Sequence, residues 1–193
     1  ILNAMNGANG ELFNEDVINF HLYADPAAEP RDFTAQAMAL TNGEMVNNKE
    51  IHYSFSNDGP VKSNAVIRLS AMESYSSDPS GDNYATLTNN GIITADLSGS
   101  ASAGMFAGMK SGNGSLDNYG NIFATSNVDN INVIGLQSDF GHLYNDSKAQ
   151  IVLTTTGENA DLIGGHSDGG DSNAKNLGYV YLKHNGGSGD IIG

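Results

Sequence analysis

The segment Leu116-Asp117-Asn118-Tyr119-Gly120-Asn121-Ile122 carries the pattern that decides how this chain folds. An apolar residue precedes an asparagine by two positions, and another apolar residue follows the asparagine a few positions later. The pattern recurs around Asn14, Asn47, Asn89, Asn118, Asn145 and, in a degenerate form, Asn176. The steps between these asparagines range from about 27 to about 42 residues, within the periods of proteins built from stacked repeats. The chain is therefore expected to be a stack of coils.

A second apolar patch follows each asparagine by about 15 to 25 residues, so each repeat contains two apolar patches. Residues 35–40, 103–109 and 133–136 are examples, and a glycine such as Gly43 or Gly141 usually precedes the next asparagine pattern. The apolar runs are short and are bounded by Gly, Asn, Asp and Ser, which predicts β-strands of four to seven residues. Residues 31–40 are the best helical candidate, but their place in the repeat favours a strand.

These observations predict an all-β fold, a parallel β-helix (β-solenoid) of about five to six coils that forms one unit over residues 1–193. We take a right-handed coil from the general preference of parallel crossover connections. The asparagines should sit at a corner, where the side-chain amides of successive coils form a ladder: Asn14, Asn47, Asn89, Asn118, Asn145 and Asn176. The chain begins and ends inside expected strands, so we expect it to be a fragment of a longer protein.

The charge of the chain limits its partners. With 22 acidic and 8 basic side chains, the net charge is -14. Such a surface repels phosphate backbones and anionic lipids, so we expect no nucleic-acid partner. No apolar run approaches the length that spans a membrane, so we expect no membrane insertion of these residues. Without cysteine, the chain has neither disulfides nor thiolate metal ligands.

Extra residues in the early coils predict loops that project from the stack, one near residues 25–31 and one near 74–84. In solenoids such insertions fall on a face where binding often occurs. The candidate binding residues are Asp25, Glu29, Arg31, Tyr75, Asp78, Asp82 and Tyr84.

No motif in the sequence indicates catalysis, a cofactor or a metal site. The five histidines lack metal-ligand spacing, so we expect each to be an exposed side chain without a role. Residues 186–190 (Gly-Gly-Ser-Gly-Asp) lack the closing glycine of a nucleophile elbow, and a turn between coils is favoured. Asp168, Asp171 and Asn173 offer oxygen ligands for a loosely held Ca²⁺ ion, but a flexible acidic loop is the favoured interpretation.

The pattern Leu-x-Asn-x-Gly-x-Ile, seen at residues 116–122 and 87–93, resembles passenger domains of bacterial autotransporters. The apolar patch at residues 103–107 is similar to theirs as well, and exoproteins of two-partner secretion are the near alternative. The resemblance covers about residues 10 to 193 and implies a right-handed β-helix that is secreted through the outer membrane and lies extracellularly, at the bacterial cell surface. Coils one to three depart from the tight repeat, and the signal peptide and C-terminal barrel of that family do not occur in this sequence.

The expected function is that of an adhesin, a virulence-associated passenger active in cell adhesion, aggregation or biofilm formation through weak contacts along one solenoid face. Its partner would be a host surface protein, a glycan or another copy of itself. Two alternatives stay open. One is an enzyme that processes polysaccharides, which needs carboxylates converging from neighbouring coils. The other is an inert stalk that carries a functional region elsewhere.

Overall fold

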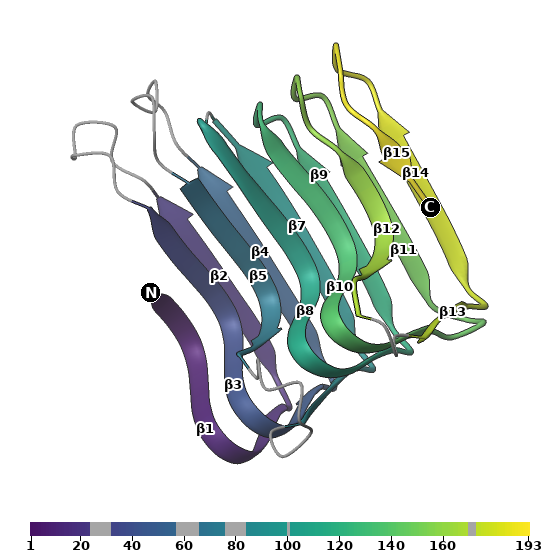
Figure 1. The fold of residues 1–193 in the computed structure, drawn as a ribbon. Helices are drawn as coiled ribbons and strands as arrows, with labels where there is room; N and C mark the ends of the chain where they lie inside the picture. The colour runs from purple at the N-terminus through teal and green to yellow at the C-terminus, as the bar shows by residue number, and fades with distance from the viewer. Residues whose placement is uncertain (24–31, 57–65, 76–83, 100, 170–172) are drawn as a thin grey trace.

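The computed structural model describes residues 1–23, 32–56, 66–75, 84–99, 101–169 and 173–193, and only the backbone of Phe33. Within these ranges the regular elements are all strands. They stack as a parallel β-solenoid of about five turns (Figure 1), which confirms the predicted fold class. The handedness of the coil stays a prediction. Nothing in the described part of the chain forms a helix long and apolar enough to cross a membrane.

The strands form two sheets, which we call the large sheet and the small sheet. The large sheet consists of β1 (Leu2–Asn14), β3 (Phe33–Asn47), β5 (Val66–Ser74), β6 (Ala85–Asn89), β8 (Ala103–Asn118), β10 (Ile131–Asn145), β12 (Leu162–Ser167), β13 (Asn173–Asn176) and β15 (Ile191–Ile192). The small sheet consists of β2 (Val17–Tyr23), β4 (Glu50–Ser56), β7 (Ile92–Ser98), β9 (Asn121–Ser126), β11 (Gln150–Thr155) and β14 (Tyr179–His184).

Every pairing within the two sheets is parallel, and equivalent positions of successive coils lie side by side. β8 and β10 pair from Gly104 and Ile131 through Asn118 and Asn145, with the glycines Gly114 and Gly141 in register. Because each coil lies on the equivalent strands of its neighbours, the backbone is hydrogen-bonded without a thick core. A side chain that recurs in the sequence therefore becomes a row along the stack.

The large-sheet strands are longer than predicted. The sequence indicates two short strands a coil, but β3, β8 and β10 each run unbroken through both apolar patches for 15, 16 and 15 residues. The glycine between the patches bends the strand without ending it. Gly43 has a φ of 112°, and a Cβ there would lie 2.0 Å from the carbonyl oxygen of Gly10 in the preceding coil. Only glycine allows that bend and that close approach together.

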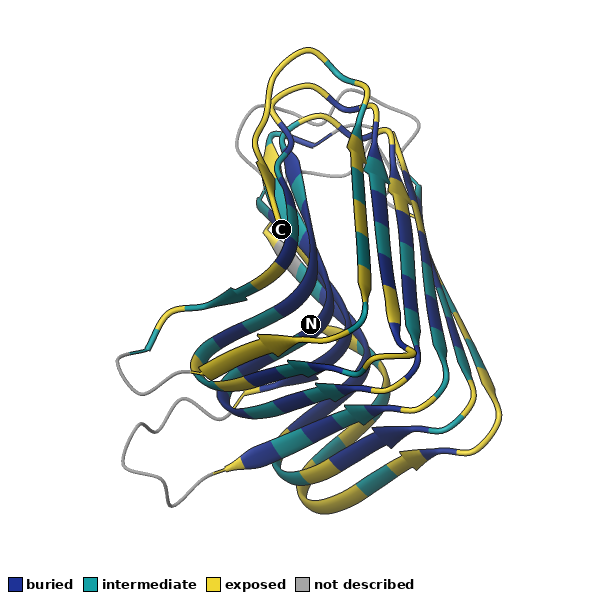
Figure 2. Ribbon diagram, turned by 90° about the vertical axis from the view of Figure 1, so that its right-hand side faces the viewer, coloured by how far each residue is buried: buried dark blue, intermediate teal, exposed yellow. Residues whose placement is uncertain are grey.

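The core lies between the two sheets, where small residues of one face bulky residues of the other. Isoleucines of the small sheet stack in register, as Ile122 and Ile151 do. Opposite them the large sheet has glycine: a Cβ on Gly108 would lie 2.8 Å from Ile122 Cγ2, and one on Gly135 would lie 2.7 Å from Ile151 Cγ2. Figure 2 shows the resulting alternation of buried and exposed residues along the strands. This complementarity lets the two sheets approach closely at these positions.

One corner of every coil carries an asparagine from the sequence pattern. The side-chain Nδ2 of each asparagine donates to the Oδ1 of the next one, over 2.7 to 2.8 Å, from Asn14 through Asn176. Asn47, Asn89 and Asn118 have no exposed surface. A buried amide is costly unless it is hydrogen-bonded, so the ladder satisfies groups that the corner would otherwise leave unpaired.

Candidate functional site

The predicted binding loops are largely outside the described residues. Five of the seven candidates, Asp25, Glu29, Arg31, Asp78 and Asp82, belong to segments 24–31 and 76–83 and lie outside the described residues. Their role in binding stays a prediction.

The remaining two candidates, Tyr75 and Tyr84, lie beside the same strand. The backbone N–H of Tyr75 donates to the Leu40 carbonyl at 3.0 Å, and the Tyr84 carbonyl accepts from the Gly43 N–H at 3.3 Å. Both side chains are exposed, to 37% and 42%. They are therefore anchored through the backbone to β3 and present part of their surface to solvent.

Tyr75 lies near a buried polar network on the large sheet. The Glu73 carboxylate, which is buried, accepts from Gln36 Nε2 at 3.0 Å and from Ser70 Oγ at 2.7 Å. Lys110 Nζ lies 3.2 Å from its other oxygen. Burial, followed by the negative charge of Glu73, raises the pKa of Tyr75 to about 12. Because the carboxylate has three partners of its own, we assign this network to holding neighbouring coils together.

A second group of side chains spans three adjacent coils on the outer face of the large sheet. Asp117 of β8 pairs with Tyr144 of β10, and Tyr144 pairs with Lys175 of β13. Tyr119 and Asp146 stand at the following corner, each one residue after its ladder asparagine. We call Asp117, Tyr119, Tyr144 and Asp146 the tyrosine–aspartate cluster.

The cluster is held by contacts between its own members. The rings of Tyr119 and Tyr144 lie 5.7 Å apart and are tilted by 57°. The Tyr144 hydroxyl donates to Asp146 Oδ2 at 3.1 Å, and Lys175 Nζ lies 6.0 Å from the centroid of the Tyr144 ring. The Tyr119 side chain remains 48% exposed. Two aromatic rings and the Asp146 carboxylate are thus fixed together at an accessible corner, and the strand register places Asp117 beside Tyr144.

The electrostatics of the two carboxylates differ. Loss of hydration raises the pKa of Asp117, an effect that His142 partly offsets. The backbone N–H of Lys148 lowers the pKa of Asp146, and the Tyr144 hydroxyl acts in the same direction. The hydrogen bond to Asp146 in turn raises the pKa of Tyr144. Among the described residues neither carboxylate forms a salt bridge, although His142 lies close enough to Asp117 to influence it electrostatically.

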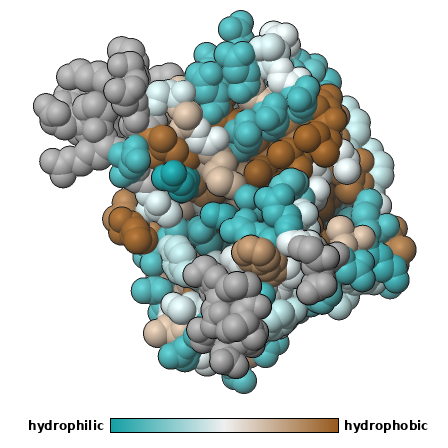
Figure 3. Space-filling model, viewed as in Figure 1, coloured by the Kyte–Doolittle hydropathy of each residue, from teal (hydrophilic) through white to brown (hydrophobic). Residues whose placement is uncertain are grey.

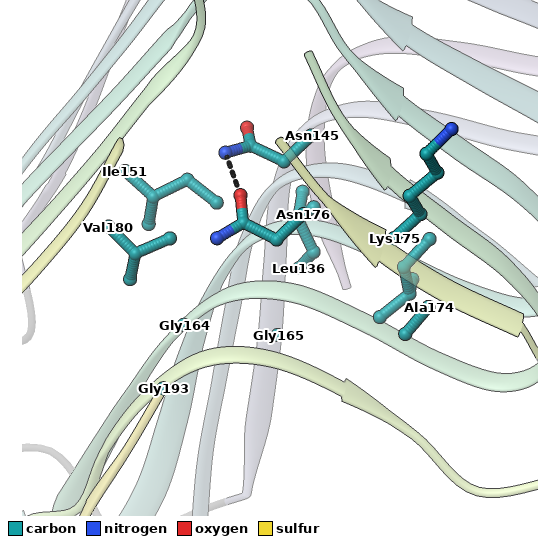
Figure 4. A pocket seen from close by; sticks show the side chains of 11 residues that line it. Leu136, Asn145, Ile151, Gly164, Gly165, Ala174, Lys175, Asn176, Val180 and Gly193 are labelled. Carbon is teal, nitrogen blue, oxygen red and sulfur yellow. Dashed lines mark hydrogen bonds between the residues drawn. The ribbon is translucent and has the colours of Figure 1, made fainter. Parts of the chain in front are cut away.

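A hollow of about 240 Å³ opens where the core meets the last described coil. Figure 4 shows Leu136, Ile151 and Val180 on its walls, with Asn145 donating to Asn176 beside it. Among the described residues that line it, Lys175 alone has an ionisable side chain, and in Figure 4 that side chain extends away from the hollow. The hollow is a continuation of the apolar core.

Exposed apolar and aromatic side chains gather on two further surfaces. On the outer face of the large sheet the exposed Ile192 lies beside the half-buried Ile163, which in turn lies beside the buried Ile134. Figure 3 shows an apolar area toward the C-terminal end of that view. On the small sheet the rings of Tyr179 and Tyr181 stack, 6.3 Å apart and 7° from parallel. Apolar or aromatic surface that a partner could contact is thus present on both sheets.

The histidines do not all match the expectation of exposed side chains. His52 Nε2 lies 2.9 Å from Glu50, and His166 Nε2 lies 3.0 Å from Asp168. His184 contradicts the expectation, because it pairs with the inward-facing Thr155 and its Nε2 is buried without a partner in the described residues. The described residues contain no group of three or more His, Asp or Glu side chains that could hold a metal ion.

Two arrangements were not predicted. The tyrosine–aspartate cluster was missed because its members read as ordinary turn and strand residues, although their position next to each ladder asparagine is visible in the sequence. A second polar stack joins Asn130, Asn159 and Ser188: Asn159 Nδ2 donates to Asn130 at 3.3 Å, and Ser188 Oγ donates to Asn159. The regular 29-residue spacing of these three positions was the signal for it.

Comparisons with known proteins place the chain in no family. No family model matches it, and neither the curated proteins nor the solved structures contain a significant match.

Proposed function

We propose that this chain is a contact module of a bacterial surface protein, an adhesin or self-association region of the autotransporter passenger type. Its mechanism is many weak contacts made by rows of side chains along the solenoid, each too weak to hold a partner alone. The resemblance of the asparagine pattern to passenger domains supports the secretion route and the extracellular location.

The observation that carries the proposal is the register of outward-facing side chains across coils. Asp117, Tyr144 and Lys175 come from three strands, yet the parallel pairing sets them side by side. A strand spacing of about 4.8 Å brings such rows within reach of a single extended partner. Tyrosine suits this role because it combines a large apolar ring with a polar hydroxyl and loses little conformational entropy on binding.

The test displays residues 1–193 on a bacterium that does not aggregate, and measures sedimentation and attachment to cultured host cells. One variant replaces Tyr119 and Tyr144 by serine. Its matched control replaces Tyr179 and Tyr181, which are also exposed tyrosines but lie on the small sheet. We expect the displayed chain to aggregate or attach, and the cluster variant to do so less than the control.

Other outcomes separate the alternatives. A displayed chain that neither aggregates nor attaches contradicts the proposal and favours an inert stalk. Equal loss in both variants contradicts the assignment of contact to the cluster and favours a contact surface that extends over both sheets.

A further inference from the structure

The tyrosine–aspartate cluster has the composition of a site for a positively charged group. Two carboxylates, Asp117 and Asp146, stand beside two aromatic rings whose faces attract cations. The surrounding molecule strengthens this preference, because its net charge of -14 attracts cations and repels anions from a distance. The same charge disfavours an acidic or phosphorylated partner.

The structure already contains a cation in contact with the cluster. Lys175 Nζ lies 6.0 Å from the centre of the Tyr144 ring, at the distance where such contacts become favourable. Lys175 itself is exposed and, among the described residues, is in no salt bridge. It reaches the ring of Tyr144 from the neighbouring coil, and Tyr119 flanks the other part of the cluster with half of its surface in solvent.

We propose that the cluster binds an arginine or lysine side chain of a basic protein segment, and that Lys175 competes with that side chain for the Tyr144 ring. A guanidinium is the better ligand, since its planar face stacks on a tyrosine ring while its N–H groups donate to carboxylates. The hydrogen bond from the Tyr144 hydroxyl positions the Asp146 carboxylate for this contact. Asp117 lies beside Tyr144, one coil earlier in the stack. The inference rests on the proposed contact function and names the chemistry of the partner.

Competition by Lys175 predicts a larger gain in peptide affinity on removal of this lysine than general charge attraction would give. Lys175→Gln removes the competing ammonium from the ring and should tighten binding of a basic peptide more than the loss of one positive charge elsewhere. Lys183→Gln is the matched control, because Lys183 is an exposed lysine on the small sheet. The two variants have the same net charge, so any difference between them is local.

The experiment measures the affinity of fluorescent hexa-arginine for the 193-residue chain by anisotropy at low salt, with hexa-glutamate and a neutral oligosaccharide as comparison probes. Asp117→Asn with Asp146→Asn should weaken hexa-arginine binding by about tenfold, and Tyr119→Leu with Tyr144→Leu by about threefold to tenfold. The matched control for the carboxylates is Asp96→Asn with Glu158→Gln, two exposed acids outside the cluster, with an expected loss below about twofold. Lys175→Gln should tighten binding by about threefold relative to Lys183→Gln.

Three results would overturn the inference. Equal weakening by the cluster and control acid variants would mean diffuse attraction without a site. Weaker binding by Lys175→Gln than by Lys183→Gln would mean that Lys175 belongs to the binding surface and does not compete. Absence of hexa-arginine binding, or binding of the oligosaccharide that the tyrosine variants abolish, would mean that the partner of the cluster is not a basic protein segment. If the displayed cells still attach or aggregate when any of these results is found, the proposed contact function stands and only the basic partner of the cluster is refuted.

Discussion

The side-chain Nδ2 of Asn89 donates to Oδ1 of Asn118 at 2.8 Å, although the two residues are 29 positions apart and both are completely buried. Asn118 in turn donates to Asn145 at 2.7 Å. Each amide thus accepts from one coil and donates to the next. The chain of amides joins the coils along the stack at the C-terminal ends of β1, β3, β6, β8, β10 and β13.

Replacing Asn118 by alanine should destabilise the chain by about 2 to 4 kcal/mol, because it removes the ladder partners of two buried groups. Asn145 Oδ1 loses its donor, and Asn89 Nδ2 keeps only the Asn121 carbonyl at 3.4 Å. Asn118→Asp tests the direction of the ladder: its carboxylate still accepts from Asn89 but no longer donates to Asn145. Urea unfolding followed by circular dichroism measures the loss. Asn90→Ala is the control, since Asn90 bonds Asn48 in a similar ladder that is exposed. Equal losses at Asn118 and Asn90 would show that burial of the ladder is unimportant.

Gly135→Ala should destabilise the core by about 1 to 3 kcal/mol through overpacking. The new Cβ would lie 2.6 Å from the Gly164 carbonyl oxygen and 2.7 Å from Ile151 Cγ2, so a backbone atom and a packed side chain would both have to move. At Gly165 the nearest atom to a new Cβ is Leu143 Cδ1 at 3.7 Å, an ordinary contact. Thermal unfolding of Gly135→Ala and Gly165→Ala compares the two; a tolerated alanine at position 135 would contradict the proposed fit between the sheets.

The stability of the chain should fall at alkaline pH. Burial raises the pKa of Tyr53, and burial with the charge of Glu73 raises that of Tyr75 to about 12. The folded state therefore holds these protons more tightly than the unfolded state, whose tyrosines titrate near 10.0. The stabilisation is complete below that value and is lost as the pH rises through the folded pKa values. Tyrosinate absorbance should show a late component near pH 12 that Tyr75→Phe removes; an unchanged titration curve in that variant would refute the assignment.

Asp117→Asn should stabilise the chain at neutral pH while it weakens binding of a basic partner. Loss of hydration raises the pKa of Asp117, so the folded state favours the protonated form. The stability from this group is complete below the unfolded pKa of 3.8 and is lost as the pH rises through the higher folded value. Urea unfolding at pH 7 should therefore give a larger free energy of unfolding for the variant than for the unchanged chain, and this difference should shrink toward pH 3. A variant that is less stable at pH 7 would mean that the ionised carboxylate has a stabilising partner.

The repeat could be read from the sequence because it depends on local chemistry. The corner asparagine recurs in every coil, and the bend and the inward position favour glycine and isoleucine, with Ala85 and Val180 as the exceptions in register. Asn89 and Asn118 are therefore recognisable even though the coils vary in length, from 27 residues between Asn118 and Asn145 to 42 residues between Asn47 and Asn89. Strand length was not readable, because Gly43 looks like the end of a strand when its neighbour Gly10 in the adjacent coil is unknown.

The candidate site was hidden for a related reason. Loops invite a functional reading, so Tyr75 and Tyr84 were singled out, whereas Tyr119 and Tyr144 read as ordinary strand and turn residues. Their rings meet only because 27 residues make one coil between Asn118 and Asn145. A contact across coils depends on the register, and a single residue of slip would turn every side chain to the opposite face.

By itself the sequence determined the fold class, the stacking of coils and the asparagine ladder, since each follows from a residue type that recurs at one phase of a period. Only the tertiary structure decided which exposed side chains share a surface. Parallel pairing fixes the register to one residue, and that register brings Asp117, Tyr144 and Lys175 together from three different coils.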